Sequence, residues 1–133
     1  DGRLAVIATD HAPHTLAEKQ SATPPPGVIG LETSLPLLLT AVQQNRLSLN
    51  RLIELMHTNP RRIFNLPEQA DTAVTVQLTP TTFTNKMVQS KCGWTPFHGT
   101  EVLAKVQKVV LRGAVVFEDG QILARPGSGK LLP

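Results

Sequence analysis

The feature that most constrains the fold is a short apolar run near the start of the chain, followed at once by three titratable side chains. Residues 4–8 (Leu-Ala-Val-Ile-Ala) predict a short buried strand. Asp10, His11 and His14 come within the next six residues. In parallel α/β barrels the residues just beyond a strand's carboxyl end face the active site, whereas the strand interior fills the core. The pattern therefore predicts that Asp10 stands at the lip of an active site.

Each of these side chains, taken alone, has an ordinary structural explanation, because an Asp after a strand often forms a turn or caps a helix. Their density, and the Pro24-Pro25-Pro26-Gly27 segment that follows, favour a functional site. Residues 10–30 read as one long loop, and loops of this length are commonly lids or binding loops. The prolines stiffen it, so it can present backbone groups to a ligand at low entropic cost. A plain connector made rigid by proline is the alternative.

Length and composition limit the protein classes. The 133 residues are enough for one modest core, whereas a complete (β/α)₈ barrel needs about 250. With Asp1 first and the key strand beginning almost at once, we interpret the sequence as the C-terminal fragment of a longer protein.

Charge, aromatic content, cysteine content and hydropathy limit the partners and the setting that we expect. The net charge of +3 is scattered and aromatic residues make up only 4% of the chain, which argues against a nucleic-acid partner. Cys92 is the single cysteine, so an internal disulfide is impossible. No apolar run approaches the roughly 20 residues that span a bilayer. We expect a cytoplasmic protein that does not bind membranes.

Helical patterns fill the middle of the first half. A helix is expected from about Thr33 or Ser34, with an apolar face at helical spacing. Ser48 can cap a second helix, which Asn59-Pro60 stops and where another short turn can start through Ile63 and Phe64. His57 falls at the end of that second helix. It suits the negative end of the helix dipole there and is not interpreted as a metal ligand.

After Leu66-Pro67 the pattern changes to that of strands. Residues 74–78 alternate between apolar and polar, residues 102–111 are rich in valine, and Asp119-Gly120 is a hairpin signal. This half is expected to form a small antiparallel β module. The two halves, 1–66 and 67–133, are therefore expected to belong to different domains.

The segment 91–97 contains the lone cysteine. A nucleophilic Cys needs a positioned base and an activated thiolate, and His98 makes no demonstrable pair with Cys92. Trp94 and Phe97 are expected to anchor the loop between the two domains by packing.

A series of short motifs, in their order along the chain, resembles dihydroorotase, of the type that forms part of the animal multifunctional pyrimidine-synthesis protein. The motifs cover nearly the whole chain: Ala8-Thr9-Asp10-His11-Ala12-Pro13-His14-Thr15, Glu18-Lys19, Pro24-Pro25-Pro26-Gly27, Gly30-Leu31-Glu32-Thr33, Asn59-Pro60-Arg61-Arg62-Ile63-Phe64, Lys91-Cys92-Gly93-Trp94-Thr95-Pro96-Phe97, Arg112-Gly113, Asp119-Gly120-Gln121 and Pro126-Gly127-Ser128-Gly129. The resemblance implies an α/β protein. Residues 1–66 would be the last βα units of a metal-dependent (β/α)₈ TIM barrel with its active-site loop, and residues 67–133 part of an appended small β-sandwich with the C-terminal tail.

The resemblance also implies the chemistry: reversible interconversion of N-carbamoyl-L-aspartate and L-dihydroorotate at a binuclear zinc site. Asp10 would be both a ligand of one zinc and the general acid/base. His14 would contact the substrate carboxylate, and the backbone of Pro26 and Gly27 would meet the substrate. His11 would orient Asp10 or the loop. The remaining metal ligands would precede this segment, so the isolated chain is expected to be inactive and without metal.

Two other functions remain open at this point. A hydantoinase or allantoinase relative would share the Asp-His pair, although the proline-rich loop and His14 argue against it. A non-catalytic homologue would serve as an assembly partner, for example for aspartate transcarbamoylase, although it would have no physical need of Asp10 and His14. The expected partners are the small-molecule substrate, the missing N-terminal part and other copies in a homo-oligomer.

Overall fold

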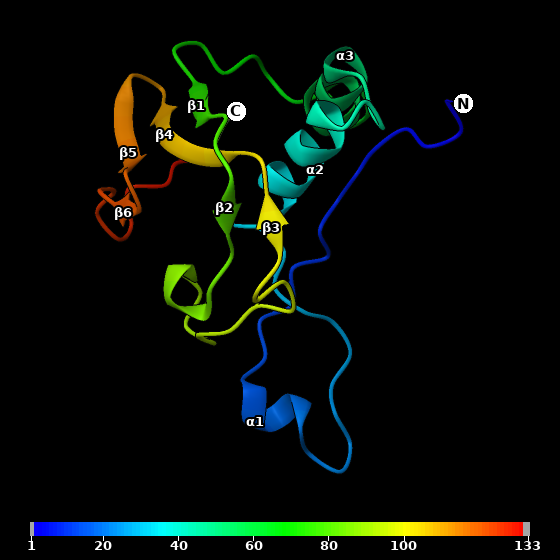
Figure 1. Ribbon diagram of the computed structural model, residues 1–133. Helices are drawn as coiled ribbons and strands as arrows, with labels where there is room; N and C mark the ends of the chain where they lie inside the picture. Colours follow the sequence, from blue (N-terminus) through cyan, green and yellow to red (C-terminus); the bar gives the residue numbers. More distant parts are fainter. Residues whose placement is uncertain (1, 132–133) are drawn as a thin grey trace.

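The computed structural model describes residues 2–131. A block of helices and a small antiparallel sheet lie side by side, and a long loop that carries α1 projects away from both (Figure 1). The helical elements are α1 (Leu16–Lys19), α2 (Ser34–Gln43), α3 (Leu49–Ile53), the π-helical turn η1 (Glu54–Thr58), α4 (Asn59–Ile63) and the 3₁₀ turn η2 (Asn85–Met87). The strands are β1 (Ala73–Gln77), β2 (Thr81–Thr82), β3 (Glu101–Val102), β4 (Lys105–Leu111), β5 (Ala114–Glu118) and β6 (Gln121–Ile122).

Helix α2 confirms the first predicted helix. Pro36 fits in its first turn, where a missing N–H costs no helical hydrogen bond. The cap differs from expectation, since neither hydroxyl at its start caps a helical N–H: Thr33 Oγ1 donates to the Gly30 carbonyl and Ser34 Oγ donates to that of Leu31, each over 3.4 Å.

The second predicted helix begins as expected and ends later than expected. The Ser48 hydroxyl accepts from the Arg51 N–H at 3.2 Å and caps α3. Asn59-Pro60 starts the predicted further turn, α4, with Pro60 in its first turn, but it does not interrupt the helical run, because η1 joins α3 to α4 without a break. His57 therefore lies within η1 and not at the helix end, so the prediction of a terminal, dipole-paired histidine was wrong.

The predicted strand at residues 4–8 is not formed among the described residues. A strand requires a hydrogen-bonded neighbour, and the segment contacts the helical run instead. The Ile7 N–H donates to the Leu55 carbonyl at 3.2 Å, and Asn59 Nδ2 donates to the Ala5 carbonyl at 2.8 Å. Arg51 donates to the Leu4 carbonyl. The segment is thus held by main-chain and side-chain groups of α3, η1 and α4.

The strands confirm a small antiparallel module. The main sheet has the order β1-β4-β5-β6, and β2 pairs with β3 in a separate ladder. Asp119-Gly120 makes the predicted hairpin between β5 and β6, with both residues at positive φ (45° and 84°). Arg112-Gly113 makes a second hairpin with similar angles (50° and 78°). Two adjacent positive φ values match the twist of type I′ hairpins.

The valine-rich run predicted as one strand is split into β3 and β4. Ala104, between them, is completely buried against Leu39 and Leu52, and so joins the sheet to the helices. The Leu103 N–H donates to Thr40 Oγ1 at 2.9 Å instead of to a strand. Within residues 2–131, no helix has the length and apolar character needed to cross a membrane.

Candidate active site

Asp10 stands in a left-handed backbone conformation, with a φ of 46°. Asp and Asn adopt this region more readily than other residues with a side chain, so the angle is not itself a sign of function. The side chain is exposed and makes no hydrogen bond or ion pair with any described residue. The carboxylate is therefore available to a group from outside residues 2–131.

His11 closes the loop that follows Asp10. Its Nδ1 accepts from the backbone N–H of Gly30 at 3.1 Å and of Leu31 at 3.4 Å. A neutral imidazole that accepts at Nδ1 carries its proton at Nε2. Of the two roles considered for His11, these contacts favour orienting the loop.

Two glycines let the loop return directly onto the residues around Asp10. A Cβ at Gly27 would lie 2.5 Å from the Ala12 Cβ, and a Cβ at Gly30 would lie 2.8 Å from the Thr9 Cβ. Gly27 also has a φ of 87°. The Ala12 N–H donates to the Val28 carbonyl at 3.0 Å. Any larger side chain at position 27 or 30 would push the two segments apart.

The loop contains a helical turn that the sequence interpretation missed. Thr15 and Glu18 form a capping box around α1: the Glu18 N–H donates to the Thr15 hydroxyl at 3.2 Å, and the Thr15 N–H donates to the Glu18 carboxylate at 2.7 Å. The Thr15 hydroxyl also donates to that carboxylate. The Thr-x-x-Glu spacing is the recognised sequence signal for this motif. The hydrogen bonds from the hydroxyl and the N–H of Thr15 lower the pKa of Glu18.

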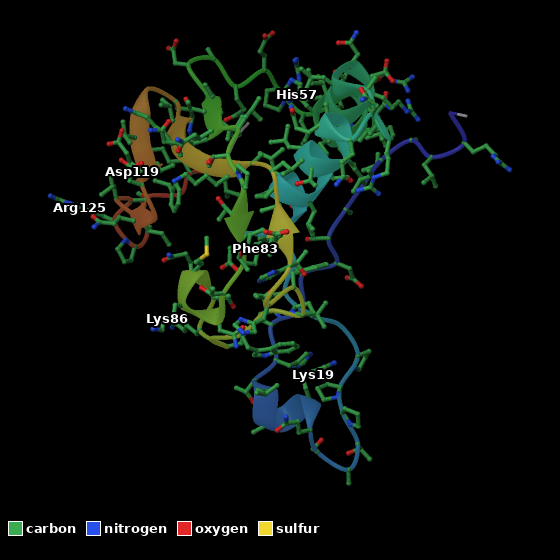
Figure 2. The ribbon with its side chains drawn as sticks, in the orientation of Figure 1. Lys19, His57, Phe83, Lys86, Asp119 and Arg125 are labelled. Carbon is green, nitrogen blue, oxygen red and sulfur yellow. The ribbon has the colours of Figure 1, made fainter. Side chains whose placement is uncertain are left out.

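Lys19, the last residue of α1, is held against the proline-rich segment. Its Nζ donates to the carbonyl of Pro25 at 2.6 Å and to that of Gly27 at 2.9 Å. Figure 2 places Lys19 within the loop, between α1 and the returning chain. No local pattern announces this contact, because it depends on how the loop folds back.

His14 is half-buried and is held through its backbone. The Trp94 Nε1–H donates to the His14 carbonyl at 2.7 Å across 80 residues of sequence. The Trp94 indole thus links segment 91–97 to the loop after Asp10 by a hydrogen bond, and the packing of Trp94 and Phe97 between two domains stays a prediction.

Among residues 2–131, no base is positioned to make Cys92 a catalytic nucleophile. Its Sγ lies 3.3 Å from Ser90 Oγ and 3.7 Å from the Trp94 carbonyl. His98 Nδ1 accepts from the Asn85 N–H at 3.2 Å, and that nitrogen is not a base for Cys92. The geometry agrees with a packing role for this loop.

The predicted site residues are brought together only in part. Gly27 packs against Ala12, which stands between Asp10 and His14 in the sequence. Pro26 is exposed. Within residues 2–131 no three His, Cys, Asp or Glu side chains gather closely enough to hold a metal ion. A cavity of about 810 Å³ lies beside the start of α2, lined by side chains of residues 31–36, of residues 83–89 and of the sheet.

The most similar sequences include multifunctional proteins and dihydroorotases. The chain is 58% identical over 127 residues to the multifunctional protein pyr1-3 of Dictyostelium discoideum, 51% identical over 125 residues to the multifunctional protein CAD of Squalus acanthias, and 36% identical over 137 residues to the dihydroorotase of Pyrococcus furiosus. These matches cover 95%, 93% and 98% of the chain. The chain spans 6% of each multifunctional protein and 33% of the Pyrococcus enzyme. No family model matches the chain.

Solved structures give the fold. An L-hydantoinase of Arthrobacter aurescens superposes with a TM-score of 0.69 at 33% identity over 74% of this chain and 24% of its own. A D-hydantoinase of a Thermus species reaches 0.81 at 26% identity, over 96% and 31%. An inactive dihydroorotase-like domain of a Chaetomium thermophilum CAD-like multifunctional protein reaches 0.63 at 33% identity, over 77% and 29%.

These structures place the chain among segments of hydantoinase-type amidohydrolase folds. Within that class, its sequence is similar over nearly its whole length to dihydroorotases and to CAD-type multifunctional proteins, so the resemblance inferred from the motifs is confirmed.

Proposed function

We propose that this chain is a segment of a dihydroorotase, which interconverts N-carbamoyl-L-aspartate and L-dihydroorotate in de novo pyrimidine biosynthesis. The observation that carries the proposal is the whole-chain similarity to a dihydroorotase, together with an Asp10 carboxylate that has no partner among residues 2–131. Activity requires the rest of the longer protein, in which this segment would supply one side of the active site.

Asp10 is the proposed general acid/base. In the hydrolytic direction a water oxygen forms a bond to the ring carbonyl carbon, and the bond between that carbon and the ring nitrogen breaks. Asp10 takes the proton from the water and delivers it to the departing nitrogen, so the number of protons balances. His14 would bind the substrate carboxylate, and the backbone of Pro26 and Gly27 would meet the substrate.

Zinc is the proposed metal, as a binuclear centre. Bound zinc would lower the pKa of a water and polarise the carbonyl. The free Asp10 carboxylate fits the role of one ligand. A catalytic zinc usually has three protein ligands, and residues 2–131 provide no cluster of three. The other ligands would therefore come from the preceding part of the protein.

The proposed architecture divides the chain at about residue 66. Residues 1–66 would form the last βα units of a TIM barrel, and residues 67–133 would form part of a β-sandwich with the C-terminal tail. The exposed side chains of the sheet support a missing partner layer: Val74 is 49% exposed and Ile122 is 58% exposed. Apolar side chains at this exposure are typical of a surface that another part of a protein covers.

The proposed setting is the cytoplasm, in a homo-oligomer, with aspartate transcarbamoylase as a fused or associated partner. The similarity to CAD-type multifunctional proteins supports a place within a longer polypeptide.

A non-catalytic dihydroorotase-like domain is the second candidate, because one structural neighbour is itself described as inactive. A hydantoinase-like enzyme is the third, because other neighbours are hydantoinases. The Asp10 carboxylate favours catalysis over the second, and the sequence relatives favour dihydroorotate over the third.

The test uses the longer protein that contains this segment. We would measure its zinc content and its turnover of dihydroorotate, hydantoin and allantoin. About two zincs per chain and turnover of dihydroorotate alone are expected. Asp10→Asn keeps the size of the side chain and tolerates left-handed backbone, and loss of the proton carrier should lower kcat by about 10²–10⁴-fold. A zinc-loaded protein that turns over none of the three would favour the non-catalytic domain.

A further inference from the structure

The peptide unit between Pro26 and Gly27 is unusual within its loop. The carbonyls on either side of it, those of Pro25 and Gly27, both accept from Lys19 Nζ. The carbonyl of Pro26 and the N–H of Gly27 have no hydrogen-bond partner among residues 2–131. The Pro26–Gly27 peptide thus has one free acceptor and one free donor. It lies between the two carbonyls that the Lys19 ammonium binds.

The Lys19 ammonium is well placed to fix this peptide. Lys19 is partly buried, and hydrogen bonds from an ionised donor are shorter and stronger than neutral ones. Its backbone is in turn fixed, because Lys19 ends the helical turn that the Thr15–Glu18 capping box starts. The chain leaves Pro25 with little freedom of its own, since each proline locks φ. Lys19 therefore holds residues 25–27 through two of their carbonyls.

Two further contacts hold the other side of the loop. The Ala12 N–H donates to the Val28 carbonyl, and the Gly30 N–H donates to His11 Nδ1. These contacts lie after the free peptide, whereas Lys19 acts on both sides of it. Without the ammonium, these two contacts alone would hold the loop closed, and they would open more often.

We propose that Lys19 is a positioning residue for substrate binding: its ammonium holds the Pro25 and Gly27 carbonyls so that the Pro26–Gly27 peptide is preorganised to hydrogen-bond the substrate. This inference rests on the proposed function, in which these two residues meet the substrate. Lys19 itself does not touch the reacting atoms. Preorganisation lowers the entropic cost of binding and leaves the chemical step alone.

The test compares Lys19→Met with Lys86→Met in the complete protein. Methionine keeps most of the length of the side chain and removes the charge, and Lys86 is an exposed lysine outside the loop (Figure 2). Lys19→Met should raise KM for dihydroorotate about tenfold or more, because charge-assisted hydrogen bonds are lost. Its kcat should change by less than about threefold, and Lys86→Met should leave both unchanged.

Hydrogen exchange gives a second readout that needs no turnover. The Ala12 and Gly30 amides report on closure of the loop, because both are bonded across it. They should exchange faster in Lys19→Met and at the normal rate in Lys86→Met. In a Cys92→Ser background, Lys19→Cys treated with 2-bromoethylamine carries an ammonium at lysine's length. That treatment should restore KM and exchange.

The outcomes separate the proposals. Unchanged KM and unchanged exchange in Lys19→Met would overturn the positioning role. Faster exchange with unchanged KM would also overturn it, because the loop would then be held without serving the substrate. A wild-type protein that does not turn over dihydroorotate would contradict the proposed function itself, and with it the substrate role of Lys19.

Discussion

The backbone N–H of Ile7 donates to the carbonyl of Leu55 at 3.2 Å, and the helical run has left that carbonyl free. In an α-helix the Asn59 N–H would bond to Leu55, but in η1 it bonds to the Glu54 carbonyl. The next N–H, at position 60, does not exist because the residue is proline. The π-helical turn therefore creates an acceptor for the segment that leads to Asp10. π-Helical turns inside helices are often found at functional sites.

Asn59→Ala should loosen that segment. The variant removes the hydrogen bond from Nδ2 to the Ala5 carbonyl, two residues before Ile7. A loss of about 1 kcal/mol is expected, which corresponds to about fivefold faster exchange of the Ile7 amide in native-state hydrogen exchange. Turnover should fall as well, because Asp10 follows three residues later.

Asn50→Ala is the matched control, since Asn50 is an exposed asparagine in α3 of the same helical run. It should leave the exchange of Ile7 unchanged. Equal exchange in the two variants would show that the Asn59 side chain does not hold the segment.

Gly27→Ala should separate the proline-rich segment from the residues beside Asp10. The new Cβ would lie 2.5 Å from the Ala12 Cβ, and an alanine at a φ of 87° is strained in addition. The expected cost in the free energy of unfolding is about 2–4 kcal/mol, measured by denaturant unfolding, with a strong loss of kcat/KM.

A double-mutant cycle isolates the clash. Ala12→Gly removes the opposing Cβ, so the double variant should recover part of the stability, with a coupling of about 1–2 kcal/mol. Gly93→Ala measures the free-energy cost of placing alanine at a positive φ without a clash. Gly93 has a φ of 68° and no heavy atom within 4 Å of an added Cβ. Additive effects of the two substitutions would argue against close contact between Gly27 and Ala12.

Local signals in the sequence predicted those elements that depend on neighbouring residues. The Ser48 cap, the apolar face of α2 and the Asp119-Gly120 hairpin each act over a few positions, and the structure confirms them. The capping box of Thr15 and Glu18 was equally readable and was overlooked within a segment interpreted as one loop.

Tertiary contacts explain what could not be predicted. The π-helical turn depends on Asn59-Pro60 together with an incoming N–H from Ile7, which lies 48 residues before its acceptor Leu55. The segment at 4–8 has the composition of a strand but no partner strand within residues 2–131. The Lys19 contacts require the loop to have closed already. Asp10 was singled out by its place after an apolar run, but its left-handed backbone was not foreseeable.

Trp94→Phe should weaken substrate binding through His14. Phenylalanine keeps an aromatic ring and removes the Nε1–H that donates to the His14 carbonyl at 2.7 Å. A lost hydrogen bond of this kind costs about 0.5–1.5 kcal/mol. If His14 binds the substrate carboxylate, KM for dihydroorotate should rise several-fold while kcat changes little.

Phe97→Leu is the control for that experiment, because Phe97 lies in the same loop and has no side-chain hydrogen bond to lose. Its KM should stay near that of the wild type. A change in kcat without a change in KM for Trp94→Phe would place the effect elsewhere than at the substrate carboxylate.

The capping box of α1 should weaken in acid. Because hydrogen bonds from Thr15 stabilise the Glu18 carboxylate, its pKa in the folded protein lies below the ordinary value of 4.5. A lowered pKa means that the stabilisation is fully present above about 4.5 and is lost as the pH falls through the folded value. A carboxyl-detected NMR titration of Glu18 should give a midpoint below 4.5, and Thr15→Val should move it upward.

Thr23→Val is the control, since Thr23 is an exposed threonine of the same loop. In this variant the midpoint of the Glu18 titration should match that of the wild type.

Glu18→Gln should reproduce part of the acid state at neutral pH, because an amide keeps one acceptor but loses the charge that the Thr15 donors favour. Since α1 ends at Lys19, fraying of this turn should also release the ammonium from the Pro25 and Gly27 carbonyls. Glu18→Gln should therefore raise KM in the same direction as Lys19→Met and by a smaller factor. An unchanged KM would mean that Lys19 keeps its contacts without help from the helical turn.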